Sequence, residues 1–578
     1  MAGFALIVRR DRLSAPTVRA TLASLARHLS PDNIHANHPD VFEEEGLARV
    51  VINPVASVRV ADHGVLLGVL FEDADWFALG APPPDGAFAI VRHDKDQVEL
   101  LTDAFASRTV WYVHSDDLFL AATSQRALVA IQGDYEPCPE AVTWMVASGN
   151  LGPEHGWDRR LRRVPAATRL RLDRRTWSLT SARSELRYVP RTLPEQDHLA
   201  RIRESIFAAC AQLRLDGAKT ALTLSGGHDS RSLLVGLTHA HVPATCLTWG
   251  LRSSMADPRN DAFIARQLAE RFGLRHEYLV LDPGDRPMRD CFSRFLRAGE
   301  GRVEDFGGYT DGFDGWRHIF EAGISVVLRG DSPGWGFPFE PFNDSWARSV
   351  VHRTTLVDDY PEGEIIHALD LAPQRPPSWI FMAEGETLDQ YRDRIYNEFE
   401  LPTCMAAFND VKCAYAEVVN PLFARTVVTT ASELPDELRH LRKGFERVVD
   451  GLVPDVPFAV RGADEPLDRS LARGPVQAEL LRELASADAR QVFSTSALDA
   501  VTADLERPLS ETKRRLRARA RAAVPRRLVS AVRAVGLAPY VHPHLHGDAR
   551  TIAYRMYIAS RMAAILREDC SAVSRWQR

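Results

Sequence analysis

The chain contains the stretch Thr220-Ala221-Leu222-Thr223-Leu224-Ser225-Gly226-Gly227-His228-Asp229-Ser230. It has the pattern of a buried strand, a glycine-rich turn and the beginning of a helix, whose apolar face continues over residues 232–237. A second β-prone segment, residues 244–249, follows at the spacing of a βαβ unit. The sequence therefore predicts an α/β fold built on a parallel sheet.

The turn between the predicted strand and helix is suited to hold an anion. Gly226 and Gly227 tolerate unusual backbone dihedral angles, so neighbouring N–H groups can converge, and the helix N-terminus adds partial positive charge. The turn lacks the lysine of a Walker A motif. Asp229 inside an anion-binding loop implies Mg²⁺ between its carboxylate and the phosphates. The alternative is a tight turn capped by Ser230, without a ligand.

Composition and charge limit the class of protein. The 578 residues are 45% hydrophobic, enough for about two to four domains with sizeable cores. The formal net charge of −6 argues against nucleic acid or an anionic membrane as the main partner. No stretch approaches the ~20 apolar residues of a membrane helix, and the seven cysteines show no zinc or disulfide spacing. We therefore expect a cytoplasmic globular protein without a nucleic-acid or membrane partner.

Three regions follow from the distribution of short apolar runs and helical patterns. Residues 1–193 are β-rich and predict a sandwich, with turn residues between the runs. Residues 194–470 begin with a helical pattern, contain the βαβ unit and then favour helices. Residues 471–578 predict a helical extension that ends on an amphipathic helix through Tyr554 and Ile565.

The loop from Ser225 to Ser230 resembles the pyrophosphate loop of the N-type ATP pyrophosphatases. Within that group, the order of motifs resembles the asparagine synthetase family. The similar N-terminal motifs are Pro84-Asp85-Gly86-Ala87-Phe88-Ala89, Asp103-Ala104-Phe105-Ala106-Ser107-Arg108, Leu120-Ala121-Ala122-Thr123-Ser124-Gln125 and Val164-Pro165-Ala166-Ala167-Thr168. The resemblance implies an Ntn-type β-sandwich like a class II glutamine amidotransferase domain, followed by an α/β ATP pyrophosphatase domain of the adenine nucleotide alpha hydrolase type.

The N-terminus departs from the family pattern. Family members that take ammonia from glutamine begin Met-Cys-Gly, whereas this chain begins Met1-Ala2-Gly3 and has no nucleophile there. The family's Asn-Gly-Glu is also not visible, its place being taken by residues 68–73. We therefore expect no glutaminase activity. β-Lactam synthetases and lasso peptide cyclases share this loss, and both use an amine of the same molecule to attack an adenylated carboxylate.

The resemblance also implies a nucleotide site. ATP and pyrophosphate would contact the loop formed by Ser225, Gly226, Gly227, His228, Asp229 and Ser230, together with Thr248, Trp249, Gly250 and Gly330. Mg²⁺ would be bound by Asp229 and by Asp331, if the segment Gly330-Asp331-Ser332-Pro333-Gly334 is a shortened form of the family's G-x-G-x-D-E. Otherwise Gly334 takes the metal ligand's place and Asp331 contacts the substrate. For Trp249, a role as a core aromatic is the alternative.

Three further residues are implied as catalytic. Ala416-Glu417-Val418-Val419-Asn420-Pro421 resembles the family's L-E-x-R-x-P, which would put Glu417 at the acceptor side as a proton acceptor. Ala463 stands where the family has a lysine that stabilises pyrophosphate, so Arg461 or Lys443 would serve instead. The alternatives are a salt-bridged glutamate and two surface cations.

The expected function is an AMP-forming, ATP-dependent carbon-nitrogen ligase that adenylates a carboxylate. The favoured form is a lasso peptide cyclase, a natural-product enzyme that closes a macrolactam in a precursor peptide and works with a leader-peptide-binding protein and a protease. The alternatives are a small-molecule ligase like β-lactam or asparagine synthetases, which would use a small carboxylate with a free amine or ammonia, and a non-catalytic scaffold.

Overall fold

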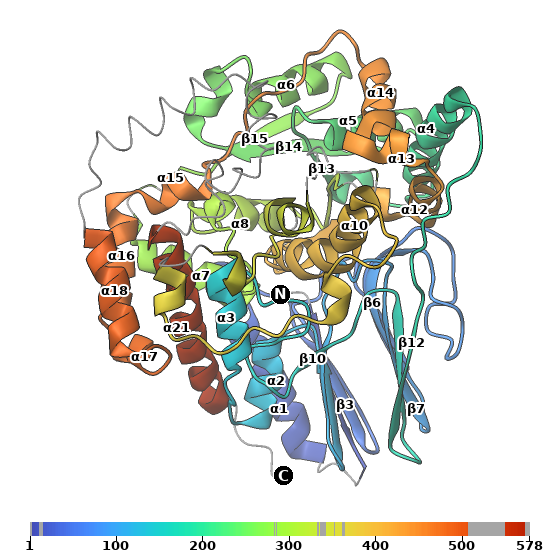
Figure 1. Cartoon of the computed structure of the whole chain (residues 1–578). Coiled ribbons are helices and arrows are strands. Elements are labelled where there is room, and N and C mark those ends of the chain that lie inside the picture. The colour runs from blue at the N-terminus through green and yellow to red at the C-terminus, as the bar shows by residue number, and fades with distance from the viewer. Residues whose placement is uncertain are drawn as a thin grey trace.

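The computed structural model describes residues 3–10, 15–282, 284, 286–331, 335, 343–351, 353–360, 365–506 and 549–572. The chain forms a mixed α/β structure with two antiparallel sheets and one parallel sheet. In Figure 1 the antiparallel strands lie below the parallel sheet, and the C-terminal helices lie beside both. No helix within these ranges is long and apolar enough to cross a membrane.

The two antiparallel sheets form an N-terminal sandwich, as the sequence predicts. The strands of the first sheet, in spatial order, are β10 (Arg162–Arg163), β8 (Trp111–His114), β9 (Leu118–Ala122), β1 (Gly3–Arg9), β3 (Leu47–Ile52) and β2 (Asp40–Glu44). Those of the second are β12 (Ser178–Arg183), β11 (Thr168–Asp173), β7 (Gln97–Thr102), β6 (Gly86–His93), β5 (Gly64–Leu70) and β4 (Arg59–Ala61).

Alternation along β1 explains why this short apolar strand is central to the sandwich. Leu6 points into the core between the two sheets, where it joins Leu67 of β5. Ile7 points to the opposite face and packs against Leu22 of helix α1 (Ala15–Leu29). Because successive side chains of a strand face opposite sides, a continuous apolar run is buried on both faces.

The parallel sheet has the strand order β15 (His276–Val280), β14 (Thr245–Gly250), β13 (Thr220–Thr223), β16 (Val326–Leu328) and β17 (Glu417–Val419). The chain runs from β13 outward through β14 to β15, and then crosses to β16 on the other side of β13. The order of strands therefore reverses between β13 and β16. In open parallel sheets, ligands bind at such a switch point, outside the carboxyl ends of the strands.

Helices cover both faces of the parallel sheet. Leu222 of β13 packs on one face with helices α4 (Glu195–Ala211), α5 (His228–His239) and α14 (Lys443–Leu452). Ala221 packs on the other face with α7 (Met288–Gly299) and α8 (Asp314–Glu321). The remaining α-helices are α2 (Gln125–Gln132), α3 (Pro139–Ser148), α6 (Asp261–Arg271), α9 (Asp344–Trp346), α10 (Leu388–Ile395), α11 (Ala406–Asp410), α12 (Arg425–Ser432), α13 (Asp436–Arg439), α15 (Leu467–Leu471), α16 (Gly474–Leu484), α17 (Ala487–Arg490), α18 (Thr495–Glu506) and α21 (Ala549–Ala572).

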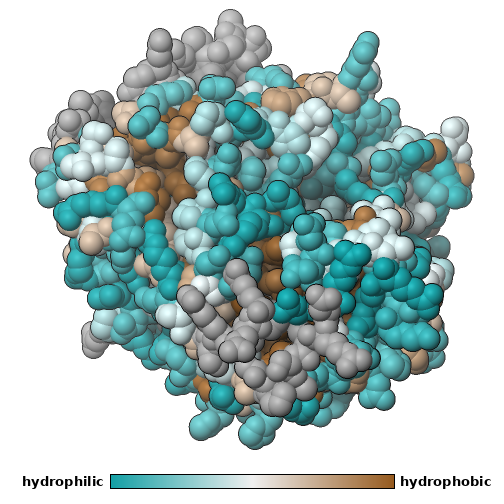
Figure 2. Space-filling model, turned by 90° about the horizontal axis from the view of Figure 1, so that it is seen from below, coloured by the Kyte–Doolittle hydropathy of each residue, from teal (hydrophilic) through white to brown (hydrophobic). Residues whose placement is uncertain are grey.

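Helix α21 ties the C-terminal region to the rest of the chain, and its apolar face contains the side chains expected from the sequence. Ile558 and Met562 are fully buried, and α21 packs against α2 and α3 of the N-terminal region. Its Asp569 accepts hydrogen bonds from Arg126 of α2 at 2.8 Å. Figure 2, which views the molecule from below, shows apolar surface gathered on the side where α16, α18 and α21 lie in Figure 1.

The prediction that helices dominate between residues 250 and 470 misses three strands. β15, β16 and β17 have five, three and three residues, too few to show a period of two. The first predicted domain boundary, after residue 193, falls just before α4, which begins at Glu195. The division into three domains stays a prediction, because the regions share buried contacts rather than standing apart.

Candidate active site at the carboxyl edge of the parallel sheet

The loop from Ser225 to Ser230 lies at the carboxyl edge of the sheet, between β13 and the first turn of α5. The hydroxyl groups of Ser225 and Ser230 are 2.9 Å apart, and the Gly227 N–H donates to the Ser225 hydroxyl at 3.2 Å. The Gly226 N–H donates to Asp261 of α6 at 2.8 Å. The loop is therefore held from inside and from the neighbouring helix, while the first-turn N–H groups of α5 have no intrahelical acceptor.

Gly226 and Gly330 are needed for space, which corrects the expectation that the glycines of the loop supply unusual dihedral angles. Gly227 has a φ of −86°, which any residue adopts. A Cβ on Gly226 would lie 2.4 Å from the Cβ of Ala459, and a Cβ on Gly330 would lie 2.7 Å from the backbone carbonyl carbon of Asp229. A larger residue at either glycine would push the surrounding loops apart.

Asp229 contacts a cation that the sequence did not reveal. Arg442 donates to Asp229 Oδ1 at 2.7 Å, and only 24% of the Asp229 side chain and 12% of the Arg442 side chain are exposed. Arg442 is the N-cap of α14, in a left-handed conformation with a φ of 60°, and its guanidinium lies 4.9 Å from the ring centroid of Phe445. These contacts aim a positive charge at the loop.

Asp331 follows β16 on the other side of the switch point. Its Oδ1 accepts from Arg329 Nε at 2.9 Å, and its backbone oxygen accepts from Asn420 at 2.5 Å. Within the described part of the chain its Oδ2 is buried without a hydrogen-bond partner, and a buried unpaired carboxylate oxygen is costly unless a further donor or cation satisfies it. Gly330 touches Asp229, so the two aspartates belong to adjoining loops. A metal ligand role for Asp331 stays a prediction, and the alternative residue Gly334 lies outside the described residues.

Tyr396 lies beside the same carboxylates. Burial is the main cause that raises the pKa of its phenol well above the usual range, and Asp331, Glu400 and Asp229 raise it further. Arg442 acts in the opposite direction. The electrostatic neighbourhood of Tyr396 therefore includes both aspartates that the sequence assigns to Mg²⁺.

A buried lysine, Lys412, lies in the electrostatic neighbourhood of Asp331. The Nζ atom of Lys412 lies 3.4 Å from the ring centroid of Phe408 and donates to Asn409 at 3.3 Å. Burial lowers its pKa well below the usual range and Arg329 lowers it further, while Asp331 acts in the opposite direction. Arg329 also lies over Phe408, at 4.8 Å. Lys412 and Arg329 thus share the ring of Phe408 on this side of the candidate site, and no motif pointed to Lys412.

The end of β14 forms another side of the candidate site. The Thr248 hydroxyl donates to the Leu224 carbonyl at 2.6 Å, which joins β14 to the start of the loop. Trp249 packs against Trp316 with ring centroids 5.6 Å apart, in agreement with a core role for its side chain. A Cβ on Gly250 would lie 2.3 Å from the backbone oxygen of Ala463. The segment that contains Ala463 therefore lies directly against the end of β14.

His228 is engaged within the protein rather than free to contact a phosphate. Its ring stacks on Phe458, with centroids 4.0 Å apart and an interplanar angle of 15°. Its Nε2 lies 3.2 Å from Asp450 of α14. The Arg231 guanidinium also contacts Phe458, at 3.8 Å from its centroid. The side chain of His228 therefore helps to fix the segment around Phe458 against α5, and only its backbone remains for the predicted nucleotide contact.

Glu417 is not available as a proton acceptor, contrary to expectation. It is the first residue of β17 and pairs with Val326, the first residue of β16, so it lies at the amino end of the strand, away from the loops. Its side chain is fully buried, and Arg108 binds both carboxylate oxygens at 2.8 and 2.7 Å. Burial raises the pKa of the Glu417 carboxyl and Arg108 acts against this. The residue joins the sheet to the N-terminal sandwich.

The two cations proposed in place of the family lysine also do not reach the loop. The side chain of Arg461 is 60% exposed and pairs with Asp257 at 3.1 Å. Lys443 is exposed at the start of α14, one residue after Arg442. The structure thus assigns the position beside Asp229 to Arg442, the neighbour of a predicted residue.

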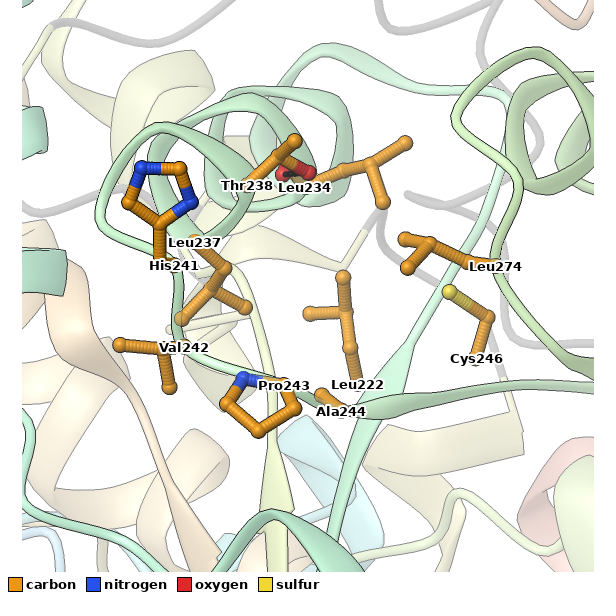
Figure 3. A pocket seen from close by; sticks show the side chains of 10 residues that line it. All are labelled: Leu222, Leu234, Leu237, Thr238, His241, Val242, Pro243, Ala244, Cys246 and Leu274. Carbon is orange, nitrogen blue, oxygen red and sulfur yellow. Dashed lines mark hydrogen bonds between the residues drawn. The ribbon is translucent and has the colours of Figure 1, made fainter.

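Two hollows lie away from the loop. Figure 3 shows an apolar cavity of about 290 Å³ at the amino end of the parallel sheet, lined by side chains that include Leu222, His241 and Cys246. The second, of about 280 Å³, is a groove between the sandwich and the sheet, where Gly68 and Glu72 face Arg214 and Lys219. Residues 68–73, which stand in place of the family's Asn-Gly-Glu, line this groove. Ala2 lies outside the described residues.

Comparisons with known proteins give weak likenesses. No protein-family model matches the chain, and no curated protein matches it in sequence. One similar solved structure is the glutamine phosphoribosylpyrophosphate (PRPP) amidotransferase of B. subtilis complexed with ADP and GMP. It is 12% identical, with a TM-score of 0.21, covering 70% of this chain and 96% of that chain. Another, described as the allosteric regulatory enzyme of purine biosynthesis, is 12% identical with a TM-score of 0.22, covering 70% and 95%. Scores this low carry no argument about function.

Proposed function

We propose that the protein is an ATP-dependent ligase that activates a carboxylate as its acyl-adenylate and joins it to an amine. The observation that carries the proposal is the meeting of two loops at the switch point of the parallel sheet, where Gly330 is packed against Asp229. One loop combines a helix N-terminus with serine hydroxyls, and the other adds a second aspartate. This combination suits a nucleotide phosphate chain with its cation.

The residues of the site fit a magnesium ion. The unpaired, buried Oδ2 of Asp331 and the part-buried carboxylate of Asp229 are hard oxygen ligands. When bound there by Asp229 and Asp331, Mg²⁺ would neutralise negative charge on the leaving pyrophosphate. The first-turn N–H groups of α5 would bind phosphate oxygens, and Arg442 would add a positive charge on the same side.

In the proposed reaction, a carboxylate oxygen of the substrate attacks the α-phosphorus of ATP and pyrophosphate leaves. An amine then attacks the acyl carbon, forming the amide and releasing AMP. The role of this chain is mainly to position the reactants and stabilise charge. Arg329, which pairs with Asp331 at 2.9 Å, is suited to attract the substrate carboxylate. Glu417 has no role as a base in this reaction, because it is held in a buried ion pair with Arg108.

The favoured substrate is a precursor peptide in which a side-chain carboxylate is joined to an amine of the same peptide, as in lasso peptide macrolactam formation. A leader-peptide-binding protein and a protease would be its partners. The sequence resemblance and the Ala2 replacement support this choice. A ligase of small carboxylates that uses a free amine or ammonia is the alternative within the same chemistry.

ATP–pyrophosphate exchange tests the proposal. The full chain is incubated with Mg²⁺, ATP and labelled pyrophosphate against a panel of amino acids, small acids and precursor peptides. We expect exchange that depends on one class of carboxylate. Exchange only with a peptide supports the cyclase, and exchange only with a small acid supports the small-molecule ligase. No exchange with any acid, together with no ATP binding at millimolar concentration, contradicts both.

A scaffold without catalysis is the second candidate, and one contact favours it. Arg442 occupies Oδ1 of Asp229, the carboxylate that a Mg²⁺ ion would need. In an active enzyme this ion pair must open or share the carboxylate when nucleotide binds. Tight binding of an ATP analogue without exchange for any carboxylate would support the scaffold.

The neighbouring residues Arg442 and Lys443 provide a matched pair of variants. We expect Arg442→Gln to lower ATP–pyrophosphate exchange by roughly tenfold or more, because it removes a charge-assisted contact beside the phosphate site. Lys443→Gln should change the rate by less than about twofold, because Lys443 is exposed. Equal effects of the two variants would show that Arg442 has no special role in binding or catalysis.

A further inference from the structure

A cluster of metal-binding residue types lies in the N-terminal sandwich, in a different part of the fold from the candidate active site. Glu44, His63 and His93 each have a ligand atom within 4.8 Å of those of the other two. Glu44 ends β2 in the first sheet, His63 lies in the turn between β4 and β5, and His93 ends β6 in the second sheet. The cluster therefore bridges the two sheets at one end of the sandwich.

His93 has the environment of a ligand without its ion. Its side chain is 0% exposed and its Nδ1 lies at ion-pair distance from Glu44, while among the described residues its Nε2 has no hydrogen-bond partner. Phe42 lies beside the ring, with centroids 5.5 Å apart, so part of the surroundings is apolar. A buried imidazole nitrogen that is left unsatisfied costs free energy, and such a group in a native protein calls for a missing partner.

The distances suit a tetrahedral ion. His93 Nδ1 lies 3.3 Å from Oε1 of Glu44, in an orientation that does not make a hydrogen bond. Bonds of about 2.0–2.1 Å to a tetrahedral ion place two ligand atoms roughly 3.3–3.4 Å apart. The backbone also links the ligands, because the His93 N–H donates to the His63 carbonyl at 2.9 Å. The third ligand atom, on the exposed side chain of His63, lies within 4.8 Å of the other two.

We propose that Glu44, His63 and His93 bind a divalent transition-metal ion of the Zn²⁺ class. Two imidazole nitrogens and one carboxylate oxygen are a ligand set that Zn²⁺ prefers. His63 is exposed, so the fourth position opens to solvent and takes a water molecule. The ion would join the turn between β4 and β5 to β6 and would cross-link the two sheets through β2.

Arg174 is the cation that competes with the metal for Glu44. It lies 3.0 Å from Oε1 of Glu44 and also donates to the Asp94 backbone oxygen at 2.8 Å. A carboxylate has two oxygens and several lone pairs, so it can accept from Arg174 and bind an ion at the same time. The positive charge of Arg174 weakens the attraction between the Glu44 carboxylate and the metal ion. The two neutral imidazoles therefore supply most of the binding free energy.

Titration of the full chain with Zn²⁺ alone, in competition with a chromophoric chelator, tests the proposal. After treatment with a chelator, the wild-type protein is expected to bind one tight equivalent of Zn²⁺ more than the His63→Ala variant. His63 is exposed, so this substitution should leave the fold intact. His93→Gln should weaken this equivalent by at least about 100-fold, more than the roughly 10–100-fold typical of outer-shell changes. His38→Ala, which removes another exposed histidine of the same region, is the matched control and should retain the equivalent.

X-ray absorption on the Zn²⁺-loaded chain gives a second readout that does not depend on variant folding. We expect two imidazole nitrogens and one or two oxygens at about 2.0–2.2 Å from the ion bound to the wild-type chain. Equal Zn²⁺ binding by wild type and His63→Ala would overturn the proposal. So would the same loss in His38→Ala, or a bound ion that lacks imidazole ligands.

Discussion

Asp229→Ala is expected to reduce carboxylate-dependent ATP–pyrophosphate exchange by at least about 100-fold, the size of effect that follows loss of a charge-stabilising group in a site closed to water. Asp229 lies in the first turn of α5, contacts Arg442 and is backed by Gly330. Removing its carboxylate leaves Arg442 unpaired next to the phosphate site and takes away one of the two proposed Mg²⁺ ligands.

Asp450→Ala is the control for this substitution. Asp450 is 57% exposed and contacts His228 at the edge of the same loop, so its loss alters surface charge near the site without removing a proposed ligand. We expect exchange within about twofold of the wild-type rate. If Asp229→Ala retained wild-type exchange while a substrate was saturating, Asp229 would not hold the metal, and the site would have to be assigned elsewhere.

Glu417→Gln is expected to destabilise the protein by about 3–5 kcal/mol, the usual cost of removing one partner from a buried ion pair. Arg108 would keep its charge in a fully buried position, where the ion pair with Asp410 at 3.3 Å would remain but the two contacts with Glu417 would be weakened. Because the pair joins the sandwich to the edge of the parallel sheet, the loss should also loosen the packing of these two regions. Urea unfolding, followed by tryptophan fluorescence, measures the change in the free energy of unfolding.

Two further variants separate the cost of an unpaired charge from a general loss of packing. Replacing both partners, as Arg108→Met with Glu417→Met, should recover most of the lost stability, because neither member of the pair is then buried without the other. The second partner of Arg108, Asp410, still pairs with Arg302 at 3.0 Å. Arg271→Ala breaks an exposed pair with Asp455 and should cost less than about 1 kcal/mol. A Glu417→Gln variant as stable as the Arg271→Ala variant would refute the assigned role of the Arg108–Glu417 pair.

The local parts of the fold could be predicted from the sequence, because their signals lie within a few residues. The strand, turn and helix around Ser225 appear as β13, the loop and α5, and the β-rich region 1–193 contains the strands of the sandwich. The strands β16 and β17 were missed because three residues cannot display a period. Their place in the sheet depends on pairing with β13 and with each other.

The partners within the candidate site could not be predicted, since they meet only through the tertiary fold. Arg442 is 213 residues from Asp229, and Arg108 is 309 residues from Glu417. A motif fixes neighbours along the chain, but it does not say which distant side chain will satisfy a buried carboxylate. For this reason the sequence predicted a catalytic base at Glu417, where the structure has a buried ion pair. For the same reason it predicted Lys443 as the cation of the site, where the structure has Arg442.

Transfer of ¹⁸O from a labelled carboxylate substrate to AMP tests the central claim most directly. The full chain is incubated with Mg²⁺-ATP and a carboxylate that supports exchange, and the AMP is analysed by mass spectrometry. Attack on the α-phosphorus predicts one ¹⁸O atom in the phosphate of each AMP formed. Unlabelled AMP, or label that appears in inorganic phosphate together with ADP, would contradict adenylation and with it the proposed role of the loop from Ser225 to Ser230.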